Sequence, residues 1–436
     1  MGIKMNFSDF GKKLCSQSGI LQLMDDIGRP LPKNVKPYRL GGGNPAMIPE
    51  ISAMYRQEMQ KIMDNGDEFE KLIGLYDSPQ GRMSFIETVA EYLSKTYGWK
   101  IGPENVAISN GSQSACFYLF NLLAGTFSSN GAKNRKKIVF PLAPEYIGYA
   151  DQGIEKEMFV SIPSTWKEEA DHTFKYHVNF ELLEEYMKKN TQVGAICVTR
   201  PTNPSGNVLT DSEITRLSKL ARQYSIPLII DNAYGLPWPN IIFTNDASPY
   251  YDDNVILSMS LSKIGLPSLR TGIIIAPAEI VTAIGNMNAI AALASGSFGQ
   301  ALAENLIKTG TLVEKAKNFV RPYYENKAKK AVQAFHKYFA GTDYAVHKSE
   351  GSIFQWLLLK GLSIPTMQFY SELKKKGVIV VPGEYFFFGD DTEHGLPPVC
   401  EHPHFNKCLR INYAGDEEEV DEGIRIIAET YRKFSK

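Results

Sequence analysis

Residues 194–235 read GAICVTRPTNPSGNVLTDSEITRLSKLARQYSIPLIIDNAYG and contain a complete strand–helix–strand pattern. The runs "GAICVT" and "PLIID" are short, apolar and bounded by turn residues, as expected of strands that are buried on both faces. Between them, Thr210 and Glu213 have the spacing of a helix capping box, and Ile214 and Leu217 recur on one helix face. Such a unit predicts two parallel strands joined by a right-handed crossover, and therefore an α/β fold.

The same alternation extends on both sides of this unit. The runs "NVAI", "KKIVF", "NVILSM" and "GIIIAP" are further candidate strands of one sheet. Long helical sequence follows, in which Pro322 is expected to kink or divide the helix. "SIFQWLLLK", "GVIVVPG" and "KCLRINYAG" then have the pattern of strands, and "DEEEVDEGIRIIAETYRKF" that of a final helix. We therefore predict a central, mostly parallel sheet in a large domain, and a smaller α+β domain.

Composition favours a protein that acts on small molecules. The chain has 436 residues, of which 43% are apolar and 22% charged, and its formal net charge is −1. This length exceeds one ordinary core and predicts two domains. The near-neutral charge gives no electrostatic reason to bind nucleic acid or an anionic membrane, so we expect neither partner.

The location expected from the sequence is cytoplasmic. The first residues lack the continuous apolar run of a secretory signal, and the weakly charged stretch Ile280–Ala303 is interrupted by asparagine, serine and glutamine. Five cysteines without framework spacing are typical of reduced thiols in that compartment.

One cluster of residues, Cys400, His402, His404 and Cys408, raises the question of a metal. Its spacing, C-x-H-x-H-x3-C, differs from the common structural zinc patterns, and it follows "HGLPP" in a predicted loop. We therefore predict no metal site.

Ligands of parallel sheets collect at the carboxyl ends of the strands, so the residues there indicate function. After "NVAI", the turn "SNGSQSA" opens a helix with Gly111, Ser112 and Gln113 at its N-terminus. Their backbone N–H groups can bind a phosphate, or Ser112 can simply cap the helix. Tyr146 follows the next strand, where its ring either covers a flat ligand or fills core.

The next two strand ends carry polar residues as well. Asn203 lies in "RPTNPSGN", a sequence that is typical of a turn. A role of Asn203 in binding a ligand is the second interpretation. Asp231 ends the apolar strand "PLIID", and Tyr234 follows it. A buried carboxylate at that point is costly unless a cation or a hydrogen-bond donor meets it.

The last strand of the series leads into "SMSLSKIGLPSLRTG", residues 258–272. By itself, Lys263 in this stretch has the sequence context of a surface lysine in a turn. Ser260 and Arg270 flank it with a hydroxyl and a guanidinium that suit a phosphate. One ligand explains the whole series, because pyridoxal phosphate needs a lysine for its aldehyde, a carboxylate for its ring nitrogen, donors for its ring oxygen and a phosphate cup.

In these features the chain resembles the fold type I pyridoxal-phosphate enzymes, and among them the class I and II aminotransferases, over essentially its whole length. The motifs "YDSPQG", "PTNPSG", "DNAYG" and "SLSK" with "RTG" occur in the family's order. "LGGGNPA", "FPLAPEYIGYAD" and "MSLSKIGLP" are more narrowly similar to motifs of the valine–pyruvate aminotransferases. The segment from Lys263 to Arg270 is one residue shorter than in many members of the family.

The resemblance implies that pyridoxal 5'-phosphate is the cofactor, and it assigns the contacts of the ring. Lys263 is expected to bind the aldehyde and then to transfer a proton, while Asp231 keeps the ring nitrogen protonated. Asn203 and Tyr234 are expected to donate to the ring oxygen, and Tyr146 to stack on the ring. Lys263, Asp231 and Tyr234 are then the catalytic residues.

The phosphate is assigned by the same resemblance to Ser260, Arg270 and the turn that contains Gly111, Ser112 and Gln113. Tyr76 of "YDSPQG" resembles the tyrosine that reaches the phosphate of the other subunit. The resemblance therefore implies a homodimer with shared active sites.

The substrate's carboxylate is assigned to Arg410 of "CLRINY", because a planar guanidinium matches two oxygens. Asn203 and Gly43 of "GGGNP" are expected to accompany it. Since Gly43 and Arg410 lie near opposite ends of the chain, the small domain is expected to combine both ends. The expected division is 1–55 for the N-terminal arm and part of the small domain, 56–320 for the large domain, and 321–436 for the C-terminal small domain.

The activity implied is transamination between a small neutral amino acid and a 2-oxo acid, with valine and pyruvate giving 3-methyl-2-oxobutanoate and alanine. Expected pocket residues, Ile20, Tyr146 and Tyr385, are apolar or weakly polar, and no second cation for an acidic side chain is identifiable. Three alternatives stay open: another aminotransferase with this cofactor, a β-eliminating lyase of the same fold, and a regulator that keeps a degenerate version of the fold. Against the regulator, the sequence has no basic DNA-binding module.

Overall fold

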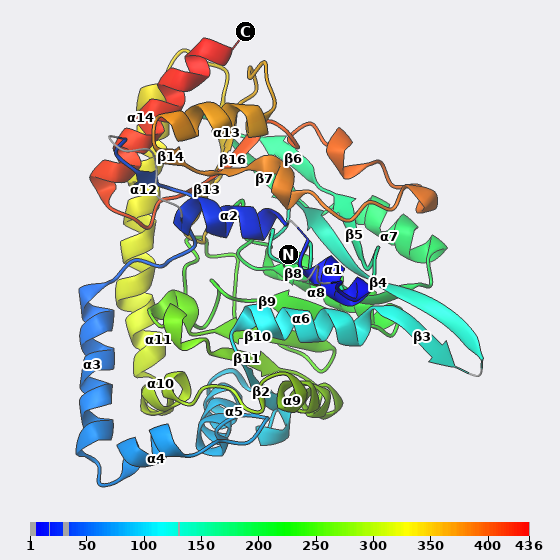
Figure 1. Cartoon of the computed structure of the whole chain (residues 1–436), viewed down its shortest axis with the longest axis vertical. Helices are drawn as coiled ribbons and strands as arrows, with labels where there is room; N and C mark the ends of the chain where they lie inside the picture. Colours follow the sequence, from blue (N-terminus) through cyan, green and yellow to red (C-terminus); the bar gives the residue numbers. More distant parts are fainter. Residues whose placement is uncertain (1–5, 17, 29–34, 130, 436) are drawn as a thin grey trace, which may run out of the picture.

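The computed structural model describes residues 6–16, 18–28, 35–129 and 131–435, and all structural statements concern these residues. Two sheets organise the chain, a central sheet of eight strands and a second sheet of six (Figure 1).

The central sheet has the order β2-β11-β10-β9-β8-β4-β3, with β5 paired to β4. Its strands are β2 (Val106–Ser109), β3 (Gly125–Ser129), β4 (Ala132–Ala143), β5 (Phe159–Pro163), β8 (Val193–Thr199), β9 (Leu228–Asp231), β10 (Val255–Ser260) and β11 (Gly272–Ile275). Strands β5, β4, β8, β9 and β10 pair in parallel, while β11 and β3 run antiparallel to their neighbours. The predicted mostly parallel sheet is confirmed.

The predicted strand–helix–strand unit is confirmed as well. Helix α8 (Asp211–Gln223) connects the parallel strands β8 and β9, and the Thr210–Glu213 capping box closes its N-terminus. Both faces of β8 are buried, because Ala195 and Cys197 belong to one core cluster and Ile196 and Val198 to the other. Two groups of helices cover the two faces: α6 (Ser112–Leu123) and α9 (Ala278–Ala292) on one, and α5 (Met83–Tyr97), α8 and α10 (Phe298–Lys308) on the other.

The second sheet has the order β15-β16-β13-β12-β7-β6 and is antiparallel except for the β12–β7 pair. Its strands are β6 (Thr165–Glu168), β7 (Thr173–His177), β12 (Ala345–His347), β13 (Phe354–Leu358), β15 (Val381–Pro382) and β16 (Cys408–Asn412), and the helices nearby in sequence are α7 (Phe180–Lys189), α13 (Thr366–Lys375) and α14 (Glu417–Phe434). Strands β6 and β7 were not expected, and they come from the range predicted for the large domain. The division at residues 55 and 320 stays a prediction.

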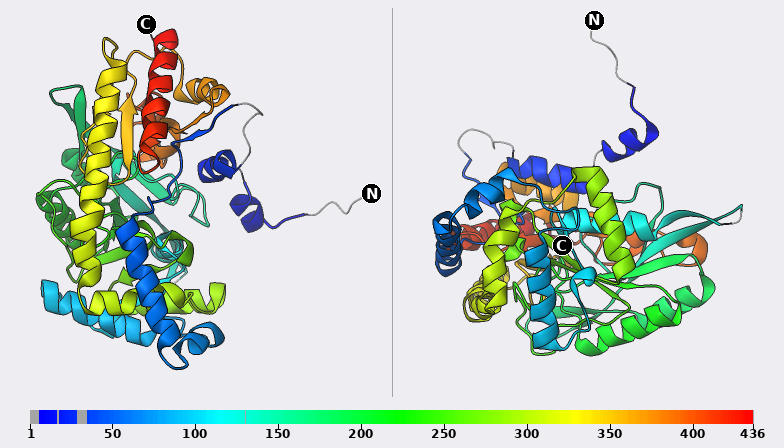
Figure 2. Two further views of the ribbon diagram at one scale, coloured as in Figure 1. Left: turned by 90° about the vertical axis from the view of Figure 1, so that its left-hand side faces the viewer. Right: turned by 90° about the horizontal axis from the view of Figure 1, so that it is seen from below.

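A long helical stretch follows the central sheet, and the predicted interruption near Pro322 is confirmed. Helix α11 (Thr311–Lys315) is followed by a π-helical turn, Ala316–Val320, and then by α12 (Arg321–Phe339). Pro322 lies in the first turn of α12 and has no backbone N–H to donate to the preceding turn, and the π-helical turn stands directly before this helix. Helix α12 runs along one side of the molecule from the level of α10 to α14, against which it packs (Figures 1 and 2).

The N-terminal part contributes to both ends of the molecule. It contains α1 (Asp9–Leu14), α2 (Gly19–Gly28), β1 (Tyr38–Arg39), α3 (Pro49–Asp64) and α4 (Glu68–Gly74). Strand β1 pairs in parallel with β14 (Val378–Ile379), which joins this part to the C-terminal region. Figure 2 shows α2 along the body and α1 farther out, where Lys13 Nζ of α1 donates hydrogen bonds to the carbonyl oxygens of Gly153 and, over 2.6 Å, Glu155. Residues 1–5, 17 and 29–34 of the predicted arm lie outside the described residues.

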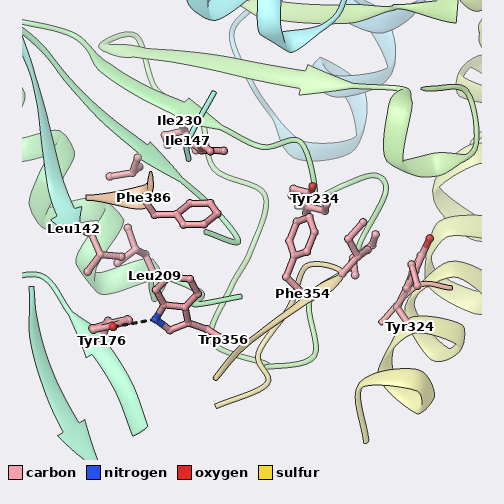
Figure 3. Close-up of a cluster of buried hydrophobic side chains, with 14 of the residues drawn as sticks. Leu142, Ile147, Tyr176, Leu209, Ile230, Tyr234, Tyr324, Phe354, Trp356 and Phe386 are labelled. Atoms are coloured by element: carbon pink, nitrogen blue, oxygen red, sulfur yellow. Dashed lines mark hydrogen bonds between the residues drawn. The ribbon is translucent and has the colours of Figure 1, made fainter. Parts of the chain in front are cut away.

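Buried side chains of the two sheets meet in one core. Leu142 and Ile230 from the central sheet and Phe354 and Trp356 from β13 belong to the same cluster (Figure 3). Trp356 Nε1 donates a hydrogen bond of 3.1 Å to the hydroxyl of Tyr176 on β7. Within the described ranges, no helix is long and apolar enough to span a membrane.

Candidate active site

A cavity of about 210 Å³ lies at the carboxyl ends of β8, β9 and β10. The last residues of these strands, Thr199, Asp231 and Ser260, all line it. The structure brings most of the predicted site residues to this one cavity, namely Gly43, Ser112, Gln113, Tyr146, Asn203, Asp231, Tyr234, Ser260, Lys263, Arg270 and Arg410.

Lys263 lies in a 3₁₀ turn, Ser262–Ile264, directly after β10. Its Nζ donates a hydrogen bond of 2.6 Å to the carbonyl oxygen of Gly43 and lies 5.5 Å from the centre of the Tyr234 ring. Desolvation, together with the positive charges of Arg410 and Arg270, lowers the pKa of Lys263 to about 8. A lysine with such a pKa is a better nucleophile and base at neutral pH than an exposed one.

Asp231 ends β9 and is 4% exposed. Its Oδ2 accepts a hydrogen bond of 2.5 Å from the Tyr149 hydroxyl, and its Oδ1 accepts one of 3.0 Å from the backbone N–H of Ala233. Burial raises the pKa of Asp231, and these two donors oppose the rise. A buried carboxyl group in this position suits a cationic ring nitrogen, which would offset the cost of its charge.

The N-terminus of α6 and Arg270 form a cradle. Gly111 precedes the helix with φ 85°, and a Cβ atom there would lie 2.2 Å from Nη2 of Arg270. Arg270 Nη1 also donates to the Ser262 hydroxyl over 3.4 Å. The first N–H groups of a helix have no partner within it, so this cradle fits a phosphate group. The alternative that Ser112 caps α6 is wrong, because Ser112 is already the first helical residue.

Arg410 lies on β16 and is 2% exposed. Its Nη1 donates to Asn203 Oδ1 and its Nη2 to the carbonyl of Gly41, each over 2.8 Å. Within the described part of the chain, its Nε has no hydrogen-bond partner. Burial lowers the pKa of Arg410 to about 10, so the group keeps its charge at neutral pH. A buried guanidinium with a free donor suits a carboxylate ligand.

Helix α2 provides an apolar wall. Ile20, Leu23 and Met24 line the cavity, and the prediction for Ile20 is thereby confirmed. Tyr385 contacts this helix instead of lining the cavity: its hydroxyl donates to Gln22, and a Cβ atom at Gly19 would lie 2.6 Å from its ring.

The positions of two predicted site residues, Gln113 and Tyr76, support their predicted roles less directly. The Gln113 side chain donates to the carbonyl of Gly148 over 3.0 Å, which leaves its backbone for the cradle. Tyr76 is 84% exposed and does not line the cavity of its own chain. Its assigned role in a second subunit stays a prediction.

Sequence reasoning missed Tyr149, Cys116 and Thr199, which also line the cavity. Cys116 lies one helical turn after Ser112, so helical periodicity could have predicted that both residues face the same cavity. Nothing in "YIGYA" distinguishes Tyr149 as the partner of Asp231.

The histidines of the cysteine–histidine cluster pack against aromatic rings. His404 Nδ1 lies 2.7 Å from the Tyr176 hydroxyl, and the Trp166 ring contacts both His402 and His404. Burial lowers the pKa of His402 to about 4 and that of His404 to about 3, so both are neutral imidazoles at neutral pH. Among the residues described, no group of three or more histidine, cysteine, aspartate or glutamate side chains is arranged to hold a metal ion.

The chain is similar to known aminotransferases. The family described as aminotransferase class I and II matches residues 55–427. The chain is 43% identical over 425 residues to valine–pyruvate aminotransferase of Escherichia coli (strain K12), covering 98% of each chain. It is 41% identical to the valine–pyruvate aminotransferase of Salmonella typhimurium LT2, whose crystal structure superposes with a TM-score of 0.83 over 95% of this chain and 98% of that one. Kynurenine aminotransferase of Pyrococcus horikoshii shares the fold at 23% identity, with a TM-score of 0.78 over 98% of this chain and 97% of that one.

The matched range contains both the central sheet and β16, and therefore the lysine, the carboxyl group and the buried arginine of the cavity. With this match and 43% identity along nearly its full length, the chain belongs to the class I and II aminotransferases.

Proposed function

We propose that this chain transfers the amino group of valine to pyruvate, giving 3-methyl-2-oxobutanoate and alanine, with pyridoxal 5'-phosphate as cofactor. The observation that carries the proposal is the meeting of Lys263, Asp231 and Arg410 in one small cavity. They supply an amine for an aldehyde, a carboxyl group for a ring nitrogen and a cation for a carboxylate. The relatives named valine–pyruvate aminotransferase, at 43% and 41% identity, support the substrate pair.

The residues present fit the cofactor. Because Gly111 has no Cβ atom, the Arg270 guanidinium can lie directly beside the N-terminus of α6, and this cation next to helix N–H groups suits a phosphate. Tyr146 lines the same cavity and can cover a flat ring, and Asn203 and Tyr234, which also line it, would donate to a ring oxygen. When bound, the cofactor supplies an electron-withdrawing ring that makes the substrate's Cα–H acidic.

Proton transfer is the task of Lys263. Its amine would accept the proton from the substrate's Cα and return it to the carbon that carries the aldehyde in the free cofactor. The lowered pKa supports this role, because it raises the fraction of Lys263 that is unprotonated at neutral pH, and only the unprotonated amine acts as the base. Asp231 holds positive charge at the ring nitrogen, and Tyr149 fixes the position of that carboxyl group.

Substrate binding uses Arg410 for the carboxylate and α2 for the side chain. Ile20, Leu23 and Met24 offer only apolar contact, which suits a small branched side chain. Of the cavity-lining residues that the structure describes, the cationic ones are Lys263, Arg270 and Arg410, and each already has a partner in this scheme. A second substrate carboxylate would be buried without a counter-charge, so aspartate and glutamate are disfavoured. Contact of α2 with the cavity also helps to exclude water.

The proposal includes a homodimer with shared sites and a cytoplasmic location. Tyr76, Leu75, Met47 and Ile290 are 84%, 67%, 91% and 90% exposed in the single chain, so a second copy has apolar side chains available to cover. All five cysteines are free, which supports a reducing compartment. Mixing an inactive Tyr76 variant with an inactive Lys263 variant should restore activity in the dimers that contain one intact site. No recovery would mean that Tyr76 serves its own subunit.

The substrate assignment is tested by kcat/KM for valine, alanine, aspartate, glutamate and phenylalanine against a panel of 2-oxo acids. We expect valine, alanine and 2-aminobutyrate all to react to some degree, because an apolar pocket discriminates between substrates that differ by one methylene by only about 1–3 kcal/mol. A clear preference for aspartate or phenylalanine would contradict the substrate pair. Formation of a 2-oxo acid without consumption of a second one would indicate elimination instead of transamination.

A further inference from the structure

Three consecutive backbone carbonyls each accept a hydrogen bond from a different side chain beside the cavity. Gly41 accepts from Arg410 Nη2 over 2.8 Å, Gly42 from Asn412 Nδ2 over 2.5 Å, and Gly43 from Lys263 Nζ over 2.6 Å. We refer to Gly41–Gly43 as the carbonyl strap. Two of its three partners are cations to which the proposed function gives a task, whereas Asn412 has no task in that scheme.

Asn412 holds the strap through both its side chain and its backbone. It is 6% exposed and ends β16, two positions after Arg410 and therefore on the same face of the strand. Its backbone N–H donates to the carbonyl of Leu40 over 2.7 Å. Its Oδ1 accepts from the N–H of Ala414 over 2.6 Å, so the amide nitrogen faces Gly42.

The strap is also held at its two ends. Upstream, β1 pairs with β14, and downstream the N–H of Ala46 donates to the Tyr324 hydroxyl over 2.8 Å. Tyr324 projects from α12 and is labelled in Figure 3. Asn412 therefore acts at the centre of a segment whose ends are fixed.

The central bond matters because peptide units are planar and move as units. A shift of Gly42 would carry the carbonyls of Gly41 and Gly43 with it. Arg410 would then lose one of the two bonds that fix the plane of its guanidinium, the other being to Asn203. The buried Nε, which has no hydrogen-bond partner in the described part of the chain and is available to a carboxylate, would no longer have a defined orientation.

We infer that Asn412 is a positioning residue for the substrate's carboxylate: through Gly42 it holds the carbonyl strap that orients Arg410. This inference rests on the proposed function, in which Arg410 binds that carboxylate. Of the three partners of the strap, Lys263 is assigned to the cofactor's aldehyde, but the groups assigned to its phosphate and ring nitrogen belong to other segments. Substrate binding and cofactor binding should therefore respond differently when Asn412 is replaced.

The test compares Asn412→Leu, which keeps the volume and removes the amide, with Asn190→Ala as a matched control. Asn190 is 5% exposed, donates from Nδ2 to the carbonyl of Tyr186 over 3.0 Å and does not line the cavity. For each variant we would measure kcat and KM, inhibition by 3-methylbutanoate, which is valine without its amino group, and the affinity of the cofactor-free chain for pyridoxal phosphate.

For Asn412→Leu we expect KM for valine and pyruvate, and the inhibition constant of 3-methylbutanoate, to rise about tenfold. Cofactor affinity should stay within about twofold and kcat within about threefold of the unmodified chain. Asn190→Ala should leave KM unchanged. A parallel loss of cofactor affinity and substrate binding in Asn412→Leu would show a merely structural role and overturn the inference.

Arg410→Lys separates the inference from the proposed function. If Arg410→Lys raises KM and folded Asn412→Leu does not, the positioning role is overturned and the carboxylate site stands. If neither raises KM, the proposed carboxylate site itself fails. Should Asn412→Leu not fold, Tyr324→Phe releases the strap at Ala46 instead, and it should raise KM about threefold; an unchanged KM would then overturn the inference.

Discussion

Asn203 and Arg410 lie 207 residues apart in the chain and are joined by a hydrogen bond of 2.8 Å, from Arg410 Nη1 to Asn203 Oδ1. Because the amide oxygen of Asn203 faces Arg410, its NH₂ group is left as the donor for a cofactor ring oxygen. One buried amide thus links the group assigned to the substrate's carboxylate with the group assigned to the cofactor.

This link makes Arg410 sensitive to a substitution that keeps its charge. Arg410→Lys should raise KM for valine and pyruvate by about 10–100-fold, because an ammonium cannot hold Asn203, the Gly41 carbonyl and a carboxylate in one plane. Steady-state kinetics with both substrates measure this effect. Unchanged KM values would place the carboxylate site elsewhere.

The phosphate cradle predicts a strong effect of one methyl group. Gly111→Ala should lower the affinity of the cofactor-free chain for pyridoxal phosphate at least about tenfold, because the new Cβ atom would lie 2.2 Å from Arg270 Nη2. Fluorescence titration measures the affinity. Gly98→Ala is the matched control: Gly98 has φ 69° with no atom within 4 Å of an added Cβ, so it should cost stability and leave the affinity unchanged.

Charge at the ring nitrogen should depend on Asp231 and, less strongly, on Tyr149. Asp231→Asn should lower kcat roughly a hundredfold, since an amide cannot balance a positive charge in a buried site. Tyr149→Phe removes a donor that opposes the raised pKa of Asp231, so that pKa should rise further and kcat fall severalfold with KM unchanged. A near-normal rate of Asp231→Asn would mean that another group protonates the ring.

Covalent loading of the cofactor should follow the titration of Lys263. Its pKa is lowered to about 8, and only the unprotonated amine attacks an aldehyde, so the loading rate should rise with pH and level off above about pH 8. At about pH 7.5, roughly a quarter of Lys263 is then unprotonated, against roughly a thousandth of an ordinary lysine. Stopped-flow absorbance at several pH values measures the rate. A rate that keeps rising to about pH 10 would indicate an ordinary lysine.

Much of the central sheet could be predicted, because its strands are apolar on both faces and are separated by clear turn signals. The helix after Thr210 has a capping box, and the polar residues Asn203, Asp231 and Lys263 follow strands that the sequence marks clearly. Because these strands are parallel, their carboxyl ends lie at the same edge of the sheet and bring these residues together. The order of the motifs along the chain therefore predicted the cavity.

The remaining features depend on contacts that no local pattern encodes. Strands β6 and β7 join the second sheet through the parallel pairing of β7 with β12, more than a hundred residues later. Tyr149 reaches Asp231 across 82 positions, and Asn412 reaches Gly42 across 370. In each case tertiary packing gives an ordinary residue its role, so the sequence offers no signal for it.

The central claim is that Lys263 binds pyridoxal phosphate covalently in this cavity. Borohydride reduction of the loaded protein, followed by peptide mapping, tests it most directly. We predict that the reduced cofactor is found on a single peptide, the one that contains Lys263, and that Lys263→Ala gives no labelled peptide. Label on any other lysine, or no label on protein that has bound the cofactor, would contradict the account.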